Sequence, residues 1–413
     1  MALSPISSFH PDSESPLLGL RNDPTPKERR HIWTLMSQSW RETLTAEQFV
    51  EQSDHMFTTA PLARNGGLTI WFLTDTTRPP DGRPVFCSCE TYRKRALVSS
   101  DPGTVSEKII HGIASVFTEP RYRRRGYAAR MMTDLAVALK TWQPDCDVAG
   151  SVLYSDIGKG FYAGFGWHPL ANNWHVEICA YGDASSLPEI EEIAVGLTVK
   201  RLCEDDLAQL CLDDEAMVRK AMAASKGGEI KSRVCVIPDL NHMRWHHSKE
   251  EFTAANFGAG RVPTFKGVLV GDKAEGNRIW AIWTHRWYRR PGPLDGAGTR
   301  NTLYVLRLVV EGGIKDGDDG GDGGKGYHGT QQQVEQMKAL VDAMRFEAMA
   351  WELDLVKIWD PSPLVMNLLS RTGVSPNVWQ REKEEIASLL WYGPGNVDEG
   401  EVEWVGNEKY AWC

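Results

Sequence analysis

The stretch 113-IASVFTEPRYRRRGYAARMM-132 decides how the chain folds. Its apolar start predicts a strand, Pro120 ends that strand, and a basic turn containing Gly126 leads into a helix. The helix is predicted from apolar residues that recur at Ala128, Met131, Met132, Leu135, Leu139 and Trp142. A helix start leaves about four backbone N–H groups unpaired and carries partial positive charge, so this turn can bind an anion such as a pyrophosphate.

The composition of the turn suits an anion as well. Gly126 has no Cβ that would keep phosphate oxygens away from the main chain, and Ala128 is small. No Gly-Lys-Ser/Thr follows, so the turn differs from a nucleotide P-loop. A basic turn before a helix is more often a solvated cap than a cofactor site, so the surrounding sequence has to carry the interpretation.

The spacing Arg123-x-x-Gly126-x-Ala128 after a strand resembles the acetyl-CoA signature of the GNAT acyltransferase superfamily. This resemblance implies an α/β fold with a mixed sheet and acetyl-CoA as co-substrate, without a metal. In the superfamily, backbone groups of the strand hold the pantetheine and the acetyl carbonyl, and the turn takes the pyrophosphate. The resemblance therefore implies these cofactor-binding residues: Val116, Phe117, Thr118, Arg123, Arg124, Arg125, Gly126, Tyr127, Ala128 and Ser155.

Downstream, a predicted strand at 147–153 is followed by 161-FYAGFGW-167. Tyr162 stands four residues before Gly166 and next to it Trp167, which is the spacing of the superfamily's tyrosine. The resemblance makes Tyr162 the general acid that hydrogen-bonds the departing sulfur of CoA and supplies its proton. The alternative is that Tyr162 is a core aromatic residue on a short helix.

The general base is left open by the residues. Many superfamily members use a glutamate at the start of the strand before the loop, but the matching position here is Gly112, so that assignment fails. Glu90, Glu119 and Asp156 are candidates, and each could instead be a solvated or capping carboxylate.

The closing segment 404-WVGNEKYAWC-413 is more apolar and aromatic than a disordered tail, so we expect it to dock. Tandem GNAT proteins of the enhanced-intracellular-survival family place the terminal carboxylate in the active site as the base. This resemblance makes the carboxylate of Cys413 a further catalytic candidate. The alternative is that the tail merely staples the two halves together.

At 413 residues the chain is too long for one ordinary core, and the order of predicted elements begins again after residue 197. We expect a GNAT acetyl-CoA-binding catalytic domain over 1–181, a linker over 182–197, a degenerate GNAT-like domain over 198–395 that shapes the acceptor pocket, and a tail over 396–413 that docks near the active site. Where the first half has its basic turn, the second has a Gly/Asp loop at 312–329, which would repel a pyrophosphate. An unrelated α/β domain with the same order of elements is the alternative for the second half.

Composition excludes several partners. The net charge of -9 argues against nucleic acid, and no apolar run approaches the roughly 20 residues that span a bilayer, so we expect a cytoplasmic protein without a membrane partner. In 242-HMRWHH-247, the adjacent His246 and His247 cannot both point inward on one regular element, which favours a solvated or aromatic-packed stretch over a metal site. The oligomeric state is left open.

Four segments together resemble the fungal lysine N6-acetyltransferase family: 33-WTLMSQSW-40, 65-NGGLTIW-71, the loop 122–128 and 407-NEKYAW-412. Members acetylate the side-chain amine of free lysine in lysine catabolism, so the resemblance implies an N-acetyltransferase acting on a small-molecule amine, lysine or a related amino acid. A protein or peptide lysine acetyltransferase and a non-catalytic acyl-CoA-binding regulator are the alternatives. Tyr162 beside an intact loop favours catalysis over sensing.

Overall fold

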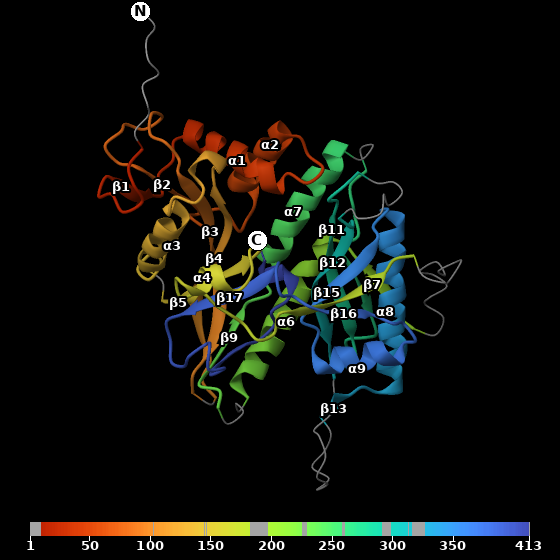
Figure 1. Ribbon diagram of the computed structural model, residues 1–413. Helices are drawn as coiled ribbons and strands as arrows, with labels where there is room; N and C mark the ends of the chain where they lie inside the picture. The colour runs from red at the N-terminus through yellow and green to blue at the C-terminus, as the bar shows by residue number, and fades with distance from the viewer. Residues whose placement is uncertain are drawn as a thin grey trace, which may run out of the picture.

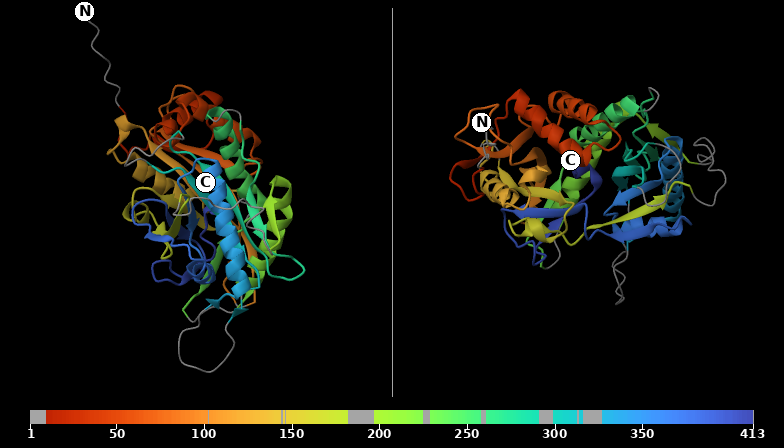
Figure 2. Two further views of the ribbon diagram at one scale, coloured as in Figure 1. Left: turned by 90° about the vertical axis from the view of Figure 1, so that its right-hand side faces the viewer. Right: turned by 45° about the horizontal axis from the view of Figure 1, so that its top comes forward.

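A computed structural model of the chain describes residues 10–101, 103–143, 145, 147–181, 197–224, 229–257, 261–290, 299–312, 314–315 and 327–412. The described strands form two large mixed sheets, of nine and seven strands, and one two-stranded ribbon. Figure 1 shows the two sheets side by side with helix α7 (Leu240–Phe257) between them, and the right-hand view of Figure 2 agrees. The predicted α/β fold class is confirmed.

The first sheet has the order β1-β2-β3-β4-β5-β17-β6, and β9 pairs with both β3 and β18. Most neighbours are antiparallel, whereas β4 with β5 and β9 with β18 are parallel. Its strands are β1 (Leu18–Arg21), β2 (Leu68–Asp75), β3 (Cys87–Ser99), β4 (Ser106–Thr118), β5 (Val148–Ser155), β6 (His168–Pro169), β9 (Ser232–Val236), β17 (Ile386–Trp391) and β18 (Val402–Trp404).

The second sheet has the order β16-β7-β15-β12-β11-β10-β8, in which only the described pair β12 and β15 is parallel. Its strands are β7 (Trp174–Cys179), β8 (Val199–Leu202), β10 (Gly267–Val270), β11 (Ile279–Arg286), β12 (Thr302–Val310), β15 (Leu355–Trp359) and β16 (Asn377–Gln380). The ribbon pairs β13 (Ile314–Lys315) with β14 (Tyr327–His328).

Most helices begin where the sequence provides a cap. Thr25, for example, forms a capping box with Glu28 ahead of α1, and Pro26 occupies the first helical position, where its missing N–H costs nothing. This helix, α1, covers Pro26–Trp40. The other described helices are α2 (Ala46–Thr59), α3 (Tyr127–Ala138), α4 (Gly160–Ala163), α6 (Glu204–Ala223), α8 (Gln331–Ala350) and α9 (Pro363–Arg371). Two short 3₁₀ turns are η1 (Pro120–Tyr122) and η2 (Lys409–Ala411).

The two halves contain the same parallel crossover. In the first half β4 leads through α3 to β5, and in the second half β12 leads through α8 to β15. After each crossover a short helix follows the second strand: α4 follows β5, and α9 follows β15. The predicted repeat of element order is therefore confirmed. The loops differ as expected in sequence, although 316–326 of the Gly/Asp loop and 182–196 of the predicted linker lie outside the described residues.

The two halves also exchange strands, which corrects one expectation. The strand β7 falls inside the expected first domain, 1–181, but it pairs with β15 and β16 in the second sheet. In return β17, near the C-terminus, pairs with β5 and β6 in the first sheet. No single cut of the chain separates the two sheets, so the boundary at residues 181–198 stays a prediction. The exchange fixes the halves against each other.

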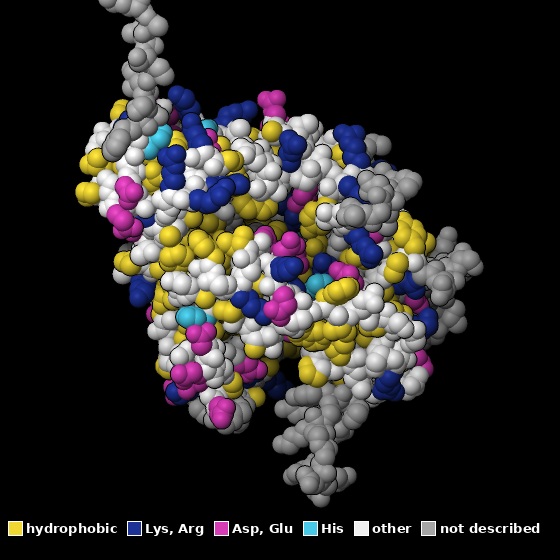
Figure 3. Space-filling view, viewed as in Figure 1, with side chains coloured by type: hydrophobic (Ala, Val, Ile, Leu, Met, Phe, Trp, Pro, Cys, Tyr) yellow, Lys and Arg dark blue, Asp and Glu magenta, His cyan; other side chains and the backbone are white. Residues whose placement is uncertain are grey.

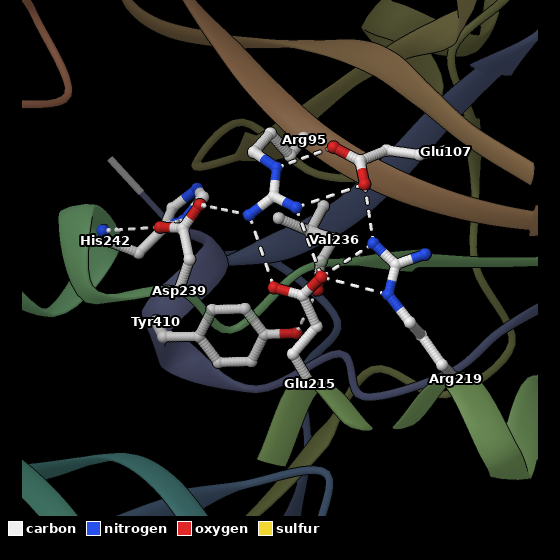
Figure 4. A network of polar contacts seen from close by, with 8 residues as sticks. All are labelled: Arg95, Glu107, Glu215, Arg219, Val236, Asp239, His242 and Tyr410. Atoms are coloured by element: carbon white, nitrogen blue, oxygen red, sulfur yellow. Dashed lines mark hydrogen bonds and ion pairs between the residues drawn. The ribbon is translucent and has the colours of Figure 1, made fainter. Parts of the chain in front are cut away.

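A network of charged side chains joins the halves on one side (Figure 4). Arg95 on β3 pairs with Glu107 on β4 (2.6 Å) and with Glu215 on α6 (3.1 Å). Arg219 on α6 bonds to the same two carboxylates. Single exposed ion pairs contribute little to stability, but partners shared between several pairs restrict all of the side chains at once.

None of the helices in the described part of the chain has the length and apolar character of a bilayer-spanning segment.

Candidate functional site

The end of β4 forms one wall of a cavity. β4 pairs in parallel with β5 only as far as Ile113, whereas its pairing with β3 continues to Thr118. The backbone of residues 114–118 therefore has no strand beside it on the β5 side, among the strands that the structure describes. Val116, Phe117 and Thr118 border the cavity here, and the Thr118 carbonyl oxygen accepts from Nε of Arg123 (3.0 Å), so the backbone groups left for a ligand are those of Val116 and Phe117.

We call this space the main cavity; its volume is about 1390 Å³. Both halves of the chain line it, because Arg286, Tyr304, Lys357 and Glu385 reach it from the second half. In the view of Figure 3 the surface is hollowed between the two halves, and acidic and basic side chains lie close together along the hollow. The main cavity is large enough for an extended cofactor with a second ligand beside it.

Helix α3 begins at the main cavity without a side-chain cap. Its N-cap residue is Gly126, with φ of 82°, and no side chain bonds to the first turn. By contrast, α1, α2, α8 and α9 are each capped by a Thr or Ser side chain. The first N–H groups of α3 are therefore available to an anion, and Arg123 and Arg124 line the cavity beside them.

Eight of the ten predicted cofactor-binding residues line the main cavity: Val116, Phe117, Thr118, Arg123, Arg124, Gly126, Tyr127 and Ala128. Arg125 and Ser155 do not. The Ser155 hydroxyl donates to the carbonyl oxygen of Gly158 (2.7 Å) and accepts from the N–H of Ile157 (3.2 Å). It closes the turn after β5, so its side chain is not part of the cavity wall.

Tyr162 stands where two cavities meet. It lies on α4, is 8% exposed, and borders both the main cavity and a smaller one. Burial, together with the neighbouring Cys87 and Cys89, raises the pKa of Tyr162 well above its usual value. The phenol therefore stays protonated near neutral pH and can donate a hydrogen bond into the space in front of Val116.

We call the smaller space the inner cavity; its volume is about 180 Å³. It shares seven wall residues with the main cavity: Trp40, Val116, Asp156, Ile157, Tyr162, Arg286 and Trp412. We call this shared region the junction. The side chains beyond the junction are mostly apolar or aromatic, such as Phe49 and Trp245, but they include the charged groups of Glu90 and Lys249.

The C-terminal tail lies between the halves. The Tyr410 side chain is fully buried and its hydroxyl donates to the carbonyl oxygen of Val236 (2.6 Å). Glu408 pairs with Arg307 on β12. Trp412 follows and forms part of the junction, stacked near His246 on α7. The tail thus lines the two cavities through Trp412 and also connects the two halves.

Lys409 holds the tail in place. Its ammonium lies 3.8 Å from the ring centroid of Trp412 and 4.1 Å from that of Trp359, and it pairs with Glu385 (3.2 Å). Burial lowers the pKa of Lys409 to about 7, although Glu385 opposes the shift. A cation over aromatic rings away from water contributes about 2 kcal/mol. Cys413, the predicted catalytic end of the tail, lies outside the described residues.

The three side-chain candidates for the base lie in different places. Glu119 borders neither cavity and pairs with Arg121 (2.7 Å). Glu90 lies beyond the junction, in the inner cavity. Asp156 lies at the junction itself, and burial raises its pKa. Asp156 is thus the one of the three carboxylates that lies beside Tyr162 at the junction.

An acidic and basic cluster at the junction was missed from the sequence. Arg286 at the end of β11 pairs with Glu42, which follows α1, and its guanidinium lies 5.2 Å from the ring of Trp412. Burial alone would raise the pKa of Glu42, but Arg286 and Lys249 together lower it. Glu42 also has an unusual φ of 52°. Glu42 and Arg286 are 244 positions apart, so no local pattern could indicate their contact.

The expectation for the histidine cluster is wrong in one respect. His246 and His247 are both buried, because α7 lies between the two halves and has partners on opposite sides. Nε2 of His246 lies 3.2 Å from the carbonyl oxygen of Tyr410, and Nε2 of His247 lies 3.0 Å from that of Trp283. Within the described residues, no group of three or more His, Cys, Asp and Glu side chains is arranged to hold a metal ion.

Comparison with known proteins gives a family match over the second half. The profile of the LYC1 GNAT-like C-terminal domain matches residues 185–413. A lysine acetyltransferase of Yarrowia lipolytica is 24% identical over 306 residues, which cover 66% of this chain and 74% of the relative. An uncharacterized protein of Saccharomyces cerevisiae is 23% identical over 297 residues, covering 64% and 70%.

Solved structures with a related shape include a probable N-acyltransferase of Enterococcus faecalis V583, with a TM-score of 0.49 and 12% identity, covering 90% of this chain and 71% of that one. Eis1 of Mycobacterium abscessus has a TM-score of 0.44 and 12% identity, covering 91% and 73%.

Proposed function

We propose a function from one premise: the chain belongs to the LYC1 GNAT-like family and is an acetyltransferase of GNAT type. In our proposal it transfers an acetyl group from acetyl-CoA to the primary amine of a small molecule. The acceptor in this proposal is the side-chain amine of free lysine or of a related amino acid; the name of the Yarrowia lipolytica relative, lysine acetyltransferase, supports lysine as the acceptor.

One observation carries the proposal: a large cavity with an uncapped helix start meets a small cavity at Val116 and Tyr162. The inner cavity of about 180 Å³ has room for about six waters at roughly 30 Å³ each. That volume suits a small amine and is too small for the flanking residues of a protein substrate. This favours a free amine over the alternative of a protein acetyltransferase.

The main cavity fits acetyl-CoA by the chemistry of its wall. The N–H groups at the start of α3, with Arg123 and Arg124 beside them, suit a diphosphate. A Cβ on Gly126 would lie 2.5 Å from the Ser13 hydroxyl oxygen, so the turn is packed in the one shape that glycine permits. The backbone of residues 114–117, which has no strand beside it on the β5 side among the described strands, suits the amides of a pantetheine chain.

Acetyl transfer forms a C–N bond between the amine and the acetyl carbon and breaks the C–S bond of the thioester. The amine loses a proton to a base, and the departing sulfur gains one. Tyr162, protonated at the junction, supplies that second proton and would be reprotonated from solvent after product release. A neutral tyrosine near an intact anion site favours catalysis over the alternative of a non-catalytic regulator.

For the base we propose the terminal carboxylate of Cys413. What supports it is that Trp412 is part of the junction, and consecutive Cα atoms are about 3.8 Å apart. Asp156 is the second candidate, because it lies at the same junction and burial raises its pKa toward the range of a useful base.

The test is a thiol-release assay of the full chain with acetyl-CoA and three kinds of acceptor: lysine, a polyamine and a lysine-containing peptide. We expect the highest kcat/KM with a free amine. If only the peptide is acetylated, the protein is instead a protein acetyltransferase. Binding of acetyl-CoA without turnover of any amine would make the protein a regulator.

A further inference from the structure

Beyond the junction the inner cavity is lined by two groups of opposite charge, one buried and the other mostly buried with 20% of its side chain exposed, and each lacks a full partner. They are Glu90, on β3, and Lys249, on α7. They come from elements that are far apart in the sequence, and each affects the pKa of the other. Buried charges cost several kcal/mol unless a partner compensates them, so two such groups facing one cavity indicate a ligand that supplies the partners.

Glu90 has hydrogen bonds but no cation. Its carboxylate accepts from Nε1 of Trp33 (3.1 Å), from the hydroxyl of Tyr92 (3.2 Å) and from the hydroxyl of Ser115 (3.0 Å). These three donors are neutral, and Glu90 forms no ion pair with any described residue. A carboxylate has about four acceptor sites, so one is left for a ligand. Burial raises the pKa of Glu90 despite the three bonds, which a cationic ligand would reverse.

Lys249 has a distant partner that is already occupied. Its ammonium lies 3.7 Å from Oε1 of Glu42, its one ion pair among the described residues. The same oxygen of Glu42 is bound by Arg286. Burial and the nearby Arg286 lower the pKa of Lys249 to about 8. An ammonium has three donors and Glu42 is the one carboxylate that pairs with it among the described residues, so donors remain for an anion in the inner cavity.

We propose that Glu90 and Lys249 bind the α-ammonium and the α-carboxylate of a free amino acid, leaving its side-chain amine at the junction. The inference rests on the proposed function. It narrows the acceptor to free amino acids with a terminal side-chain amine, because a polyamine offers nothing to Lys249. A lysine within a peptide carries neither α charge. Glu90 and Lys249 are thus residues that determine acceptor specificity, whereas the groups that do the chemistry lie at the junction.

Three acceptors test the two halves of this site separately. Lysine carries both α groups, 6-aminohexanoate lacks the α-amine, and 1,5-diaminopentane lacks the carboxylate. For the unchanged protein we expect kcat/KM to be highest for lysine, with each analogue lower by about 10- to 100-fold, the range of one hydrogen bond to a charged group.

Two variants should then separate the analogues. Lys249→Met should raise KM for lysine and 6-aminohexanoate by about 10- to 100-fold and leave 1,5-diaminopentane within about 2-fold. Glu90→Gln, which keeps the shape of the side chain, should weaken lysine and 1,5-diaminopentane and leave 6-aminohexanoate unchanged. Lys338→Met, on the exposed face of α8, removes the same charge away from the cavity and should change no acceptor.

The outcomes distinguish two kinds of failure. If no free amine is acetylated, the proposed function is wrong. If lysine and both analogues react equally well, or each variant weakens all three acceptors by the same factor, the function stands and the α-group site is refuted. Calorimetric affinity for CoA in each variant shows whether it is folded. Should Lys249→Met fail to fold, the ranking of the three acceptors by the unchanged protein decides alone.

Discussion

Replacing Gly126 by alanine should weaken CoA binding selectively. Gly126 has φ of 82°, a region that costs an L-residue roughly 1–2 kcal/mol, and its new Cβ would meet Oγ of the buried Ser13 at 2.5 Å. Either the turn or Ser13 must move, so the first N–H groups of α3 lose their alignment. An anion at a helix start gains about 0.3–2 kcal/mol. We therefore expect the Kd for CoA to rise about 2- to 30-fold.

Gly373→Ala is the matched control. Gly373 has φ of 81°, and a Cβ there would meet nothing within 4 Å. It follows α9 and borders neither cavity. Both variants should therefore lose a similar amount of stability through the backbone, while calorimetric titration with CoA separates them. Equal Kd values for Gly126→Ala and the unchanged protein would refute the role of the α3 start, and equal losses in both variants would show a general effect of destabilisation.

The remaining predictions concern Tyr162, the general base and Lys409. Tyr162→Phe should lower kcat by roughly 10²- to 10⁴-fold at unchanged Kd for CoA, and an unchanged kcat in the steady-state assay would remove the tyrosine as acid. A two-residue extension beyond Cys413 should abolish turnover while Asp156→Asn keeps most of it; the reverse result assigns the base to Asp156. Lys409→Met should raise the KM of the acceptor by loosening Trp412. The pKa of Lys409 is lowered from 10.5 to about 7, so the unfolded chain binds more protons between these values and stability rises with pH there. Denaturant unfolding at pH 7 and pH 10 should show less of this rise in Lys409→Met, and an equal rise in both proteins would contradict the buried cation.

Local patterns predicted the parts of the fold that local chemistry determines. The strand, turn and helix predicted over 113–132 match β4, the turn at Gly126 and α3. The basic turn around Gly126 predicted the uncapped start of α3, because a glycine in place of a Thr or Ser leaves the N–H groups free. The predicted strand at 147–153 likewise matches β5.

Long-range pairing was beyond sequence patterns. The strands β7 and β17 have six residues each, too few for a pattern that selects one sheet, and only the packed structure determines which one each joins. The error at His246 and His247 has the same origin: α7 packs against both halves of the chain, so two adjacent side chains are buried by different neighbours, which only the packed structure shows. Lys249 reaches the inner cavity from this helix, so the residues of the proposed acceptor site could not be predicted from the sequence either.

The central claim is that CoA lies in the main cavity with its diphosphate at the start of α3 and its sulfur at Tyr162. A crystal structure of the full chain with CoA and lysine tests it most directly. We predict diphosphate oxygens about 2.9 Å from the first backbone nitrogens of α3, and the lysine side-chain amine at the junction with its α groups in the inner cavity. A diphosphate bound elsewhere, with the N–H groups after Gly126 open to water, would contradict the account.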